Sequence, residues 1–331
     1  MREQTPESVE ALRRLLGELV SRIIANTHPQ RLLHAGQLVV FFDDTEIEVY
    51  GDHFEWAKTN YKGDKALSWQ TLWVGPLLAD CYLGSPGDVS SRLLEMLERN
   101  RRFWEGKDAH FYADSASSCG EYLEGIAAEG WHYTVSYNKW PEPLERLAEG
   151  LPQWAWKEKG GKYYSFIRHQ PSGCKSPKLY AVKRWRDGLF YEYSFIACDD
   201  RQTDAVMVNE RHALKGEKER LFSDLLSDLD LHRPPCLALI ANQIYYLVGA
   251  MAYNLLVGVK LMYLGDEDQR VGLKKLLSIL VHIPGKIYRR SRQWVVRLMV
   301  DSGWLSWWKR WLEVGWIEYG VGRPRLRVAS G

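Results

Sequence analysis

The chain has 331 residues, and a hydrophobic content of 46% gives it enough apolar side chains to bury a large core, which excludes a disordered protein. Its formal charge of +2 is uneven, because residues 270–331 hold 13 Lys or Arg against 3 Asp or Glu and leave the remainder acidic. Five scattered cysteines without CxxC or Cys/His spacing exclude a zinc ribbon and a disulfide framework.

A helix is predicted over residues 6–26, where apolar residues recur at helical spacing behind Thr5 and Pro6 as cap and first-turn pair. No apolar run follows the charges of MREQTPESVEALRR, so we expect no secretory signal. The cysteine usage and this N-terminus together predict a protein of the reducing cytoplasm.

A short buried strand is predicted over residues 38–43, and it ends in two adjacent carboxylates, Asp43 and Asp44. Apolar β-formers that end in acids are typical of a strand tip that enters a negatively charged site. A strand that ends at a solvated turn is the alternative, and this stretch alone favours it. Because successive strand residues face opposite sides, Asp43 and Asp44 should point to different neighbours.

The next elements predict a mixed sheet with helices packed against it. Antiparallel runs are expected at 46–50, 67–74 and 77–83, and a helix of about four turns follows in SPGDVSSRLLEMLERNRRFW. The strand DAHFYAD ends in Asp114, and a helix over about 118–130 and the strand WHYTVSY come after it. Two separate strands therefore end in carboxylates.

Residues 140–208 differ in composition and pattern from the segments before them. Alternating aromatic runs separated by Gly, Pro and Asp predict a small antiparallel β-insertion. Helical pattern returns at about residue 209, where the apolar residues of EKERLFSDLLSDLDL point inward and Glu219 is a candidate third carboxylate. Taken alone, Glu219 is more typical of a solvated helix face.

The uncharged stretch 234–259 is long enough to span a bilayer. Two asparagines and a glutamine would then lie at hydrocarbon depth, so we interpret it as a core helix of a soluble protein and expect no membrane partner. A membrane-associated protein is the alternative.

The C-terminal part combines basic residues with six of the fifteen tryptophans. Such residues can hold phosphates and stack on bases, or can form a helical packing face with snorkelling Arg side chains. We expect residues 270–331 to supply most of the sequence-independent affinity for DNA. The candidate DNA-binding residues are Lys274, Lys275, Arg289, Arg290 and Arg292, at spacings that would line one or two helices.

Three carboxylates from two strand ends and a helix are the donor set that a pair of Mg²⁺ ions needs, because each ion takes few protein oxygens and keeps sites for water and phosphate. Four blocks carry these acids and their surroundings in a fixed order: FFDDTEIEVYG, FYADSASSCGEYLEGIAAEGWHYTVSYNK, LKGEKERLFSDLLSDLDLHRPPC and ANQIYYLVGAMAYNLL. Over roughly residues 10–300 the chain resembles the DDE transposases of bacterial insertion sequences.

The resemblance implies an α/β fold with a mixed sheet: a ribonuclease-H-like core, an antiparallel β-insertion between the second Asp and the Glu, and a helical C-terminal region. The implied organisation is an N-terminal helix (1–37), a core in two parts (38–139 and 209–265), the insertion (140–208) and a basic Trp-rich helical tail (266–331).

The resemblance also implies strand cleavage and strand transfer of DNA with two Mg²⁺ or Mn²⁺ ions, with Asp43, Asp114 and Glu219 as catalytic residues and metal ligands. The implied partners are double-stranded DNA at the element ends and target, and a second copy of the chain on that DNA. A cytoplasmic location at the bacterial nucleoid follows.

The sequence departs from the family pattern on the helix that carries Glu219. The family places Tyr, Arg and Lys seven and four residues before the Glu and seven after it, where this chain has His212, Lys215 and Leu226. His212 and Lys215 remain candidate DNA contacts, whereas Leu226 cannot contact phosphate. Only 42 residues precede Asp43, so the family's N-terminal DNA-binding domain is expected to be missing. A truncated or catalytically decayed DNA-binding derivative is therefore the alternative function.

Overall fold

The computed structural model describes residues 5–51, 53–60, 62–86, 92–138, 141–299, 304–306 and 308. The chain divides into two compact units, Met1–Leu255 and Leu256–Gly331.

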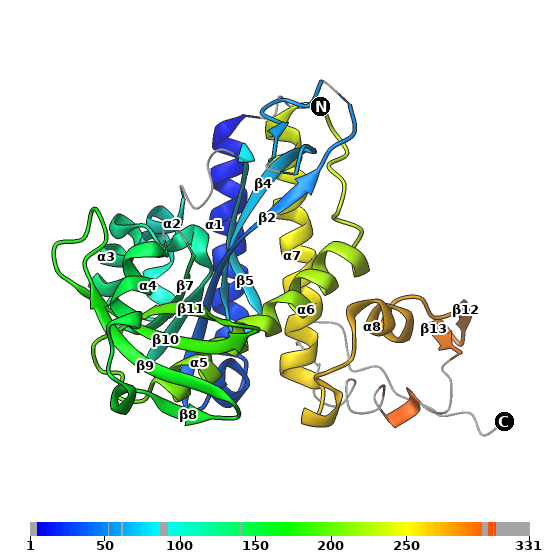
Figure 1. Ribbon diagram of the computed structural model, residues 1–331. Coiled ribbons are helices and arrows are strands. Elements are labelled where there is room, and N and C mark those ends of the chain that lie inside the picture. The colour runs from blue at the N-terminus through cyan, green and yellow to red at the C-terminus, as the bar shows by residue number, and fades with distance from the viewer. Residues whose placement is uncertain are drawn as a thin grey trace. The chain divides into compact units, whose positions relative to one another are not determined.

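An 11-stranded mixed sheet forms the centre of the first unit (Figure 1). Its strands are β1 (Leu33–His34), β2 (Gln37–Glu48), β3 (Lys58–Thr59), β4 (Lys65–Val74), β5 (Leu77–Gly84), β6 (Ala109–Ala113), β7 (His132–Tyr137), β8 (Lys157–Lys159), β9 (Lys162–His169), β10 (Lys178–Asp187) and β11 (Phe190–Cys198). The strand order is β3-β4-β2-β6-β7-β11-β10-β9-β8, with β1 paired to β2 and β5 paired to β4.

The strands β5, β4, β2, β6 and β7 form the ribonuclease-H-like core. The first three are antiparallel neighbours, and β6 and β7 then run parallel to β2. The insertion supplies β8–β11, which continue this sheet because β11 pairs antiparallel with β7. The predicted α/β fold with a mixed sheet and an inserted antiparallel region is confirmed.

Strand β2 is longer than the sequence predicts. It does not end at Asp43 and Asp44 but continues to Glu48, paired with β4 throughout. The polar second half of β2 stays in the sheet because its side chains have hydrogen-bond partners. Ser68 donates to Asp44 at 2.6 Å, and Asn60 donates to Glu46 at 2.8 Å. The separate run expected at 46–50 is thus the end of β2.

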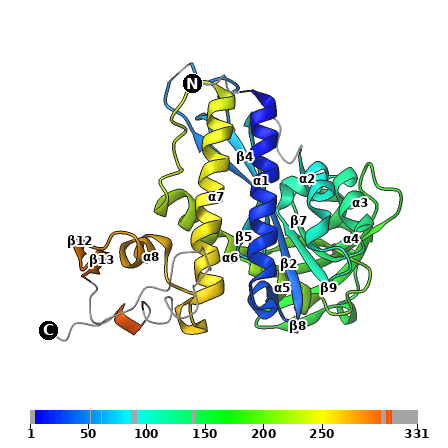
Figure 2. The ribbon, with the colours of Figure 1, turned by 180° about the vertical axis from the view of Figure 1, so that it is seen from behind.

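The N-terminal helix is confirmed as α1 (Pro6–Ala25), whose Thr5 side chain accepts a hydrogen bond from the Ser8 backbone N–H. Three more helices precede β8: α2 (Leu93–Asn100), α3 (Gly120–Ala128) and α4 (Glu142–Glu149). Helix α2 has eight residues, fewer than the four turns predicted, and part of the predicted segment lies outside the described residues. Figure 2 shows α1 on the face of the sheet turned to the viewer.

Two helices follow the insertion, α5 (Ala205–His212) and α6 (Glu217–Ser223), and a longer one, α7 (Leu239–Tyr263), comes after them. In the described chain α7 is the helix long and apolar enough to cross a membrane, and half of its most apolar window is buried. Its Asn254 side chain bonds the backbone N–H and C=O of Leu78, and Tyr253 donates to the Pro76 carbonyl. These are the contacts of a helix packed on a sheet, as the core-helix interpretation expects.

The second unit contains α8 (Leu273–Leu280) and a hairpin of β12 (Gly285–Arg290) and β13 (Gln293–Leu298). The hairpin corrects the expectation of a wholly helical tail. Trp308 is buried and donates to the Ile279 carbonyl, whereas Trp294 is 73% exposed. The tail tryptophans thus include both packed and exposed side chains, and Trp307, Trp311 and Trp316 lie outside the described residues.

Candidate active site

The first two predicted acids lie side by side on neighbouring parallel strands. Strands β2 and β6 pair with Leu38 opposite Ala109 and Phe41 opposite Tyr112. Continuing this register by two residues places Asp114 beside Asp43. Asp43 lies inside β2, and Asp114 follows β6 as the N-cap of a short 3₁₀ helix, Ser115–Ser117, where it accepts a hydrogen bond from the Ala116 N–H at 2.9 Å.

Asp43 is buried, and Asp44 beside it is not part of the same group. Burial raises the pKa of Asp43, the negative charge of Asp114 raises it further, and the positive charge of Lys218 opposes both. Asp44 instead accepts a hydrogen bond from Ser68. The two adjacent acids therefore have different neighbours, as strand alternation requires.

Strand β4, on the side of β2 opposite to β6, holds the backbone of Asp43 in place. The Thr71 hydroxyl donates to the Asp43 carbonyl oxygen at 3.1 Å, and Trp73 Nε1 donates to the same hydroxyl at 2.9 Å. Trp73 in turn packs against Phe222 of α6, with ring centroids 5.5 Å apart. This contact fixes α6 over the acidic pair.

Helix α6 turns a lysine toward the acids and the predicted glutamate outward. Leu221, Phe222 and Leu225 are buried, and Lys218 lies three and four residues before the first two, on the same face. The Lys218 Nζ lies 2.5 Å from Asp43 Oδ1, with only 8% of the lysine side chain exposed. Glu219, one position further, is exposed.

A second lysine, Lys215, lies within electrostatic reach of all three predicted acids. Burial and the charge of Lys218 lower the pKa of Lys215, while Asp114, Asp43 and Glu219 raise it. Two lysines therefore place positive charge near Asp43 and Asp114, and Lys218 makes the direct ion pair with Asp43.

His212 also lies next to this group. The β6–β7 register, in which His110 pairs with His132, places Ser136 beside Asp114 when it is continued. His212 Nε2 lies 2.8 Å from the Ser136 hydroxyl. Burial, followed by the charges of Lys215 and Lys218, lowers the pKa of His212 to about 3, so the ring is neutral at pH 7.

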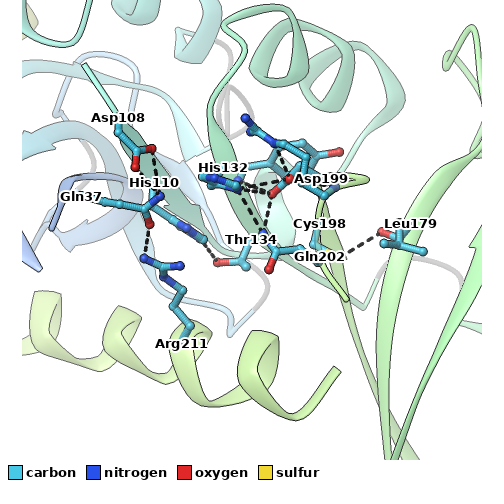
Figure 3. A network of polar contacts seen from close by, with 12 residues as sticks. Gln37, Asp108, His110, His132, Thr134, Leu179, Cys198, Asp199, Gln202 and Arg211 are labelled. Atoms are coloured by element: carbon cyan, nitrogen blue, oxygen red, sulfur yellow. Dashed lines mark hydrogen bonds and ion pairs between the residues drawn. The ribbon is translucent and has the colours of Figure 1, made fainter. Parts of the chain in front are cut away.

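A polar network anchors α5, the helix that leads to Lys215 and Lys218 (Figure 3). Arg211 donates to the Gln37 side chain, and Gln37 donates to both carboxylate oxygens of Asp108 at 2.9 and 3.0 Å. On the next strands His110 contacts Thr134, and His132 contacts Asp199 at 3.2 Å. This network lies at the start of the parallel strands, away from Asp43 and Asp114.

The chemistry of Asp43 and Asp114 fits a hard divalent cation. They are oxygen donors in register, they repel each other, and the Lys218 ammonium stands in as their counter-charge. Within the described residues no three His, Cys, Asp or Glu side chains gather closely enough to hold a metal ion, so Glu219 does not join the pair here. The two-ion site with Glu219 as ligand stays a prediction.

The family relationship follows from this arrangement together with a sequence match. Residues 34–255 match the family model described as the transposase DDE domain. The chain belongs to the DDE transposase family. No curated protein matches the sequence. Membership makes DNA the substrate class, and transposases of this family generally use divalent metal ions.

Lys218 was not predicted from the sequence as a site residue. Its signal was present, since Lys218 falls on the inward stripe with Leu221, Phe222 and Leu225. A charged residue in the run GEKER is otherwise typical of a solvated face, and Glu219 in fact has that exposure. Leu226, expected to replace a DNA contact, is half-buried in a five-residue π-helical turn, Asp224–Asp228.

Proposed function

We propose that this chain is a DNA transposase that cleaves DNA and transfers strands with Mg²⁺ or Mn²⁺. The observation that carries the proposal is the pair of Asp43 in β2 and Asp114 just after β6, on strands in the ribonuclease-H-like order, with Lys218 of α6 as the compensating cation. In this proposal it works in the cytoplasm at the nucleoid, as a homodimer on double-stranded DNA.

Each residue of the site has a defined part in this proposal. Asp43 and Asp114 would hold a divalent ion, which when bound acts as a Lewis acid on phosphoryl oxygen and lowers the pKa of bound water. Strands β4 and β6 flank Asp43, so its carboxylate is fixed before DNA arrives. Lys215, which is only half-buried, neutralises a DNA phosphate that approaches the acids. Glu219 is the predicted third acid.

The β12–β13 hairpin is the proposed surface for the DNA backbone. Cross-strand pairing puts Lys286 opposite Arg297, and alternation places Tyr288 and Arg290 on that same face. Ile287, Val296, Trp294 and Leu298 share the other face with Arg289. A two-stranded ribbon fits the major groove, and its basic face can neutralise phosphates. Lys274 and Lys275 on α8 and Arg292 in the hairpin turn add to the charge.

A second candidate function is a DNA-binding derivative that does not cleave. Two observations favour it: Glu219 is exposed, and Lys218 occupies an oxygen of Asp43. In that case the acidic pair is a structural remnant, while the cations of the second unit retain affinity for DNA.

A cleavage assay on plasmid DNA that carries the natural flanks of the coding sequence tests the proposal. The wild-type protein should cleave with Mg²⁺ or Mn²⁺, and Asp43→Asn or Asp114→Asn should abolish cleavage while DNA binding persists. Asp44→Asn is the matched control, because Asp44 is adjacent in the same strand but bonds Ser68. Cleavage that survives in Asp43→Asn, or that continues in EDTA, contradicts the proposal. Binding without cleavage under every metal condition favours the second candidate.

A further inference from the structure

The Lys218–Asp43 contact is a buried ion pair in a place where the family binds a metal ion. The Nζ–Oδ1 distance is 2.5 Å, and the side chains of Lys218 and Asp43 are 8% and 12% exposed. Removing both charges from water is unfavourable, so such a pair forms where each partner has a strong need for compensation. Asp43 has that need, because Asp114 lies beside it at the end of the neighbouring strand β6.

The lysine is directed at Asp43 by the packing of α6. Lys218 belongs to the stripe that includes Leu221 and Phe222, and Phe222 is fixed against Trp69 and Trp73 with ring centroids 6.3 and 5.5 Å apart. With this anchorage, the ammonium of Lys218 takes an Asp43 oxygen that a divalent ion would also take. The ammonium and a divalent ion at the same carboxylate would repel each other, so each weakens the binding of the other.

We infer that Lys218 is a built-in counter-ion that competes with a divalent metal ion for Asp43, so that the ion pair weakens metal binding. This inference rests on the proposed function, which makes Asp43 and Asp114 the metal-binding pair. It adds that metal affinity in this chain is set by a residue that is not a ligand.

The neighbourhood of α6 allows the lysine to leave. The helix has seven residues, with a 3₁₀ turn, Ala213–Gly216, before it and the π-helical turn Asp224–Asp228 after it. Changes from α to 3₁₀ or π spacing within a helical segment often mark hinges. The four-carbon stem of lysine also gives the ammonium several staggered positions without moving the backbone.

Titration of the full chain with Mn²⁺, followed by calorimetry, tests the inference. Lys218→Met removes the charge and keeps the length, and it should lower the dissociation constant for Mn²⁺ at least about tenfold, because an adjacent opposite charge changes the proton affinity of a carboxylate by one to three decades. Lys218→Arg keeps the charge and should bind Mn²⁺ as the wild type does. Lys178→Met is the matched control, because Lys178 is equally buried and pairs with Glu124 at 2.9 Å on β10.

Thermal unfolding with and without Mn²⁺ covers the case in which Lys218→Met folds weakly. A tighter ion stabilises the folded state more, so Mn²⁺ should raise the Tm of Lys218→Met more than that of the wild type. If Lys218→Met and wild type bind Mn²⁺ equally while Asp43→Asn weakens binding, the counter-ion inference is wrong and the proposed metal site stands. Binding that no substitution at Asp43 or Asp114 affects would overturn both.

Discussion

Two buried lysines of the first unit and the basic residues of the hairpin in the second unit carry their charge in opposite ways. In the first unit Lys218 and Lys178 are buried and each lies within 3 Å of a carboxylate. In the second unit Lys286, Arg289 and Arg290 are exposed on a two-stranded hairpin. A buried ion pair affects the stability of the fold and the charge around it, and salt screens it little. Exposed cations can bind a polyanion such as DNA, and that binding weakens as the salt concentration rises.

The largest expected effect concerns stability at the buried pair. Lys218→Met should lower the free energy of unfolding by about 3 kcal/mol, because it leaves the buried Asp43 carboxylate without its counter-charge. Urea unfolding at pH 7 without divalent ions measures it. Lys286→Met on the hairpin should change stability by less than about 0.5 kcal/mol, because that side chain is exposed.

A double variant distinguishes the ion pair from simple packing. Asp43→Asn combined with Lys218→Met removes both charges and should recover most of the lost stability, because neither partner is then left uncompensated. If the double variant is as unstable as Lys218→Met alone, the loss comes from packing, and the contrast between the two units does not rest on charge.

A smaller effect is expected on the pH dependence of the first unit. Burial, and then the charge of Arg211, lowers the pKa of His110 to about 2. An unfolded chain protonates this ring below about pH 6.5, but the folded chain does not. Stability is therefore full above that pH and falls as the pH drops, by up to about 1.4 kcal/mol per pH unit for one group.

Unfolding measured between pH 7 and pH 5 tests this expectation. His110→Asn should flatten the pH dependence, whatever it does to stability at pH 7. His34→Asn is the control, because His34 is exposed. An equal slope in wild type and His110→Asn would show that other groups cause the acid sensitivity.

The sequence predicted the acidic pair but not how its strand continues. Two strands that each carry an apolar run before an acid were enough to bring Asp43 and Asp114 together, because parallel neighbours share a register. The predicted end of β2 was wrong because Asp44 and Glu46 accept hydrogen bonds from Ser68 and Asn60, which are distant in the sequence. The local pattern of residues does not indicate such long-range partners.

The second unit shows the same limit. Spacing of basic residues suggested helices, yet residues 285–298 pair as a hairpin. Its turn is made by Ser291 and Arg292 with φ of 50° and 64°, values usually taken by Asn and Gly in such turns. The dipeptide therefore gave no turn signal, although Ile287, Val295 and Val296 have strand propensity.

The last prediction uses the two faces of the hairpin. Lys286 and Arg290 share the basic face, so Lys286→Ala with Arg290→Ala should make the slope of log K against log[salt] shallower by about 1.8, the release of two phosphate contacts. Fluorescence anisotropy with a DNA duplex between 50 and 200 mM salt measures it.

The control for this hairpin prediction is Arg289→Ala, because Arg289 pairs with Trp294 on the opposite face. It should change the slope by less than about 0.9, the value for one phosphate contact. If Arg289→Ala reduces the slope as much as a substitution of Arg290, both faces contact DNA and the ribbon does not lie on one groove wall. If neither variant changes the slope and both lower the Tm, the hairpin cations support folding, and the contrast between buried and exposed charge fails at the hairpin.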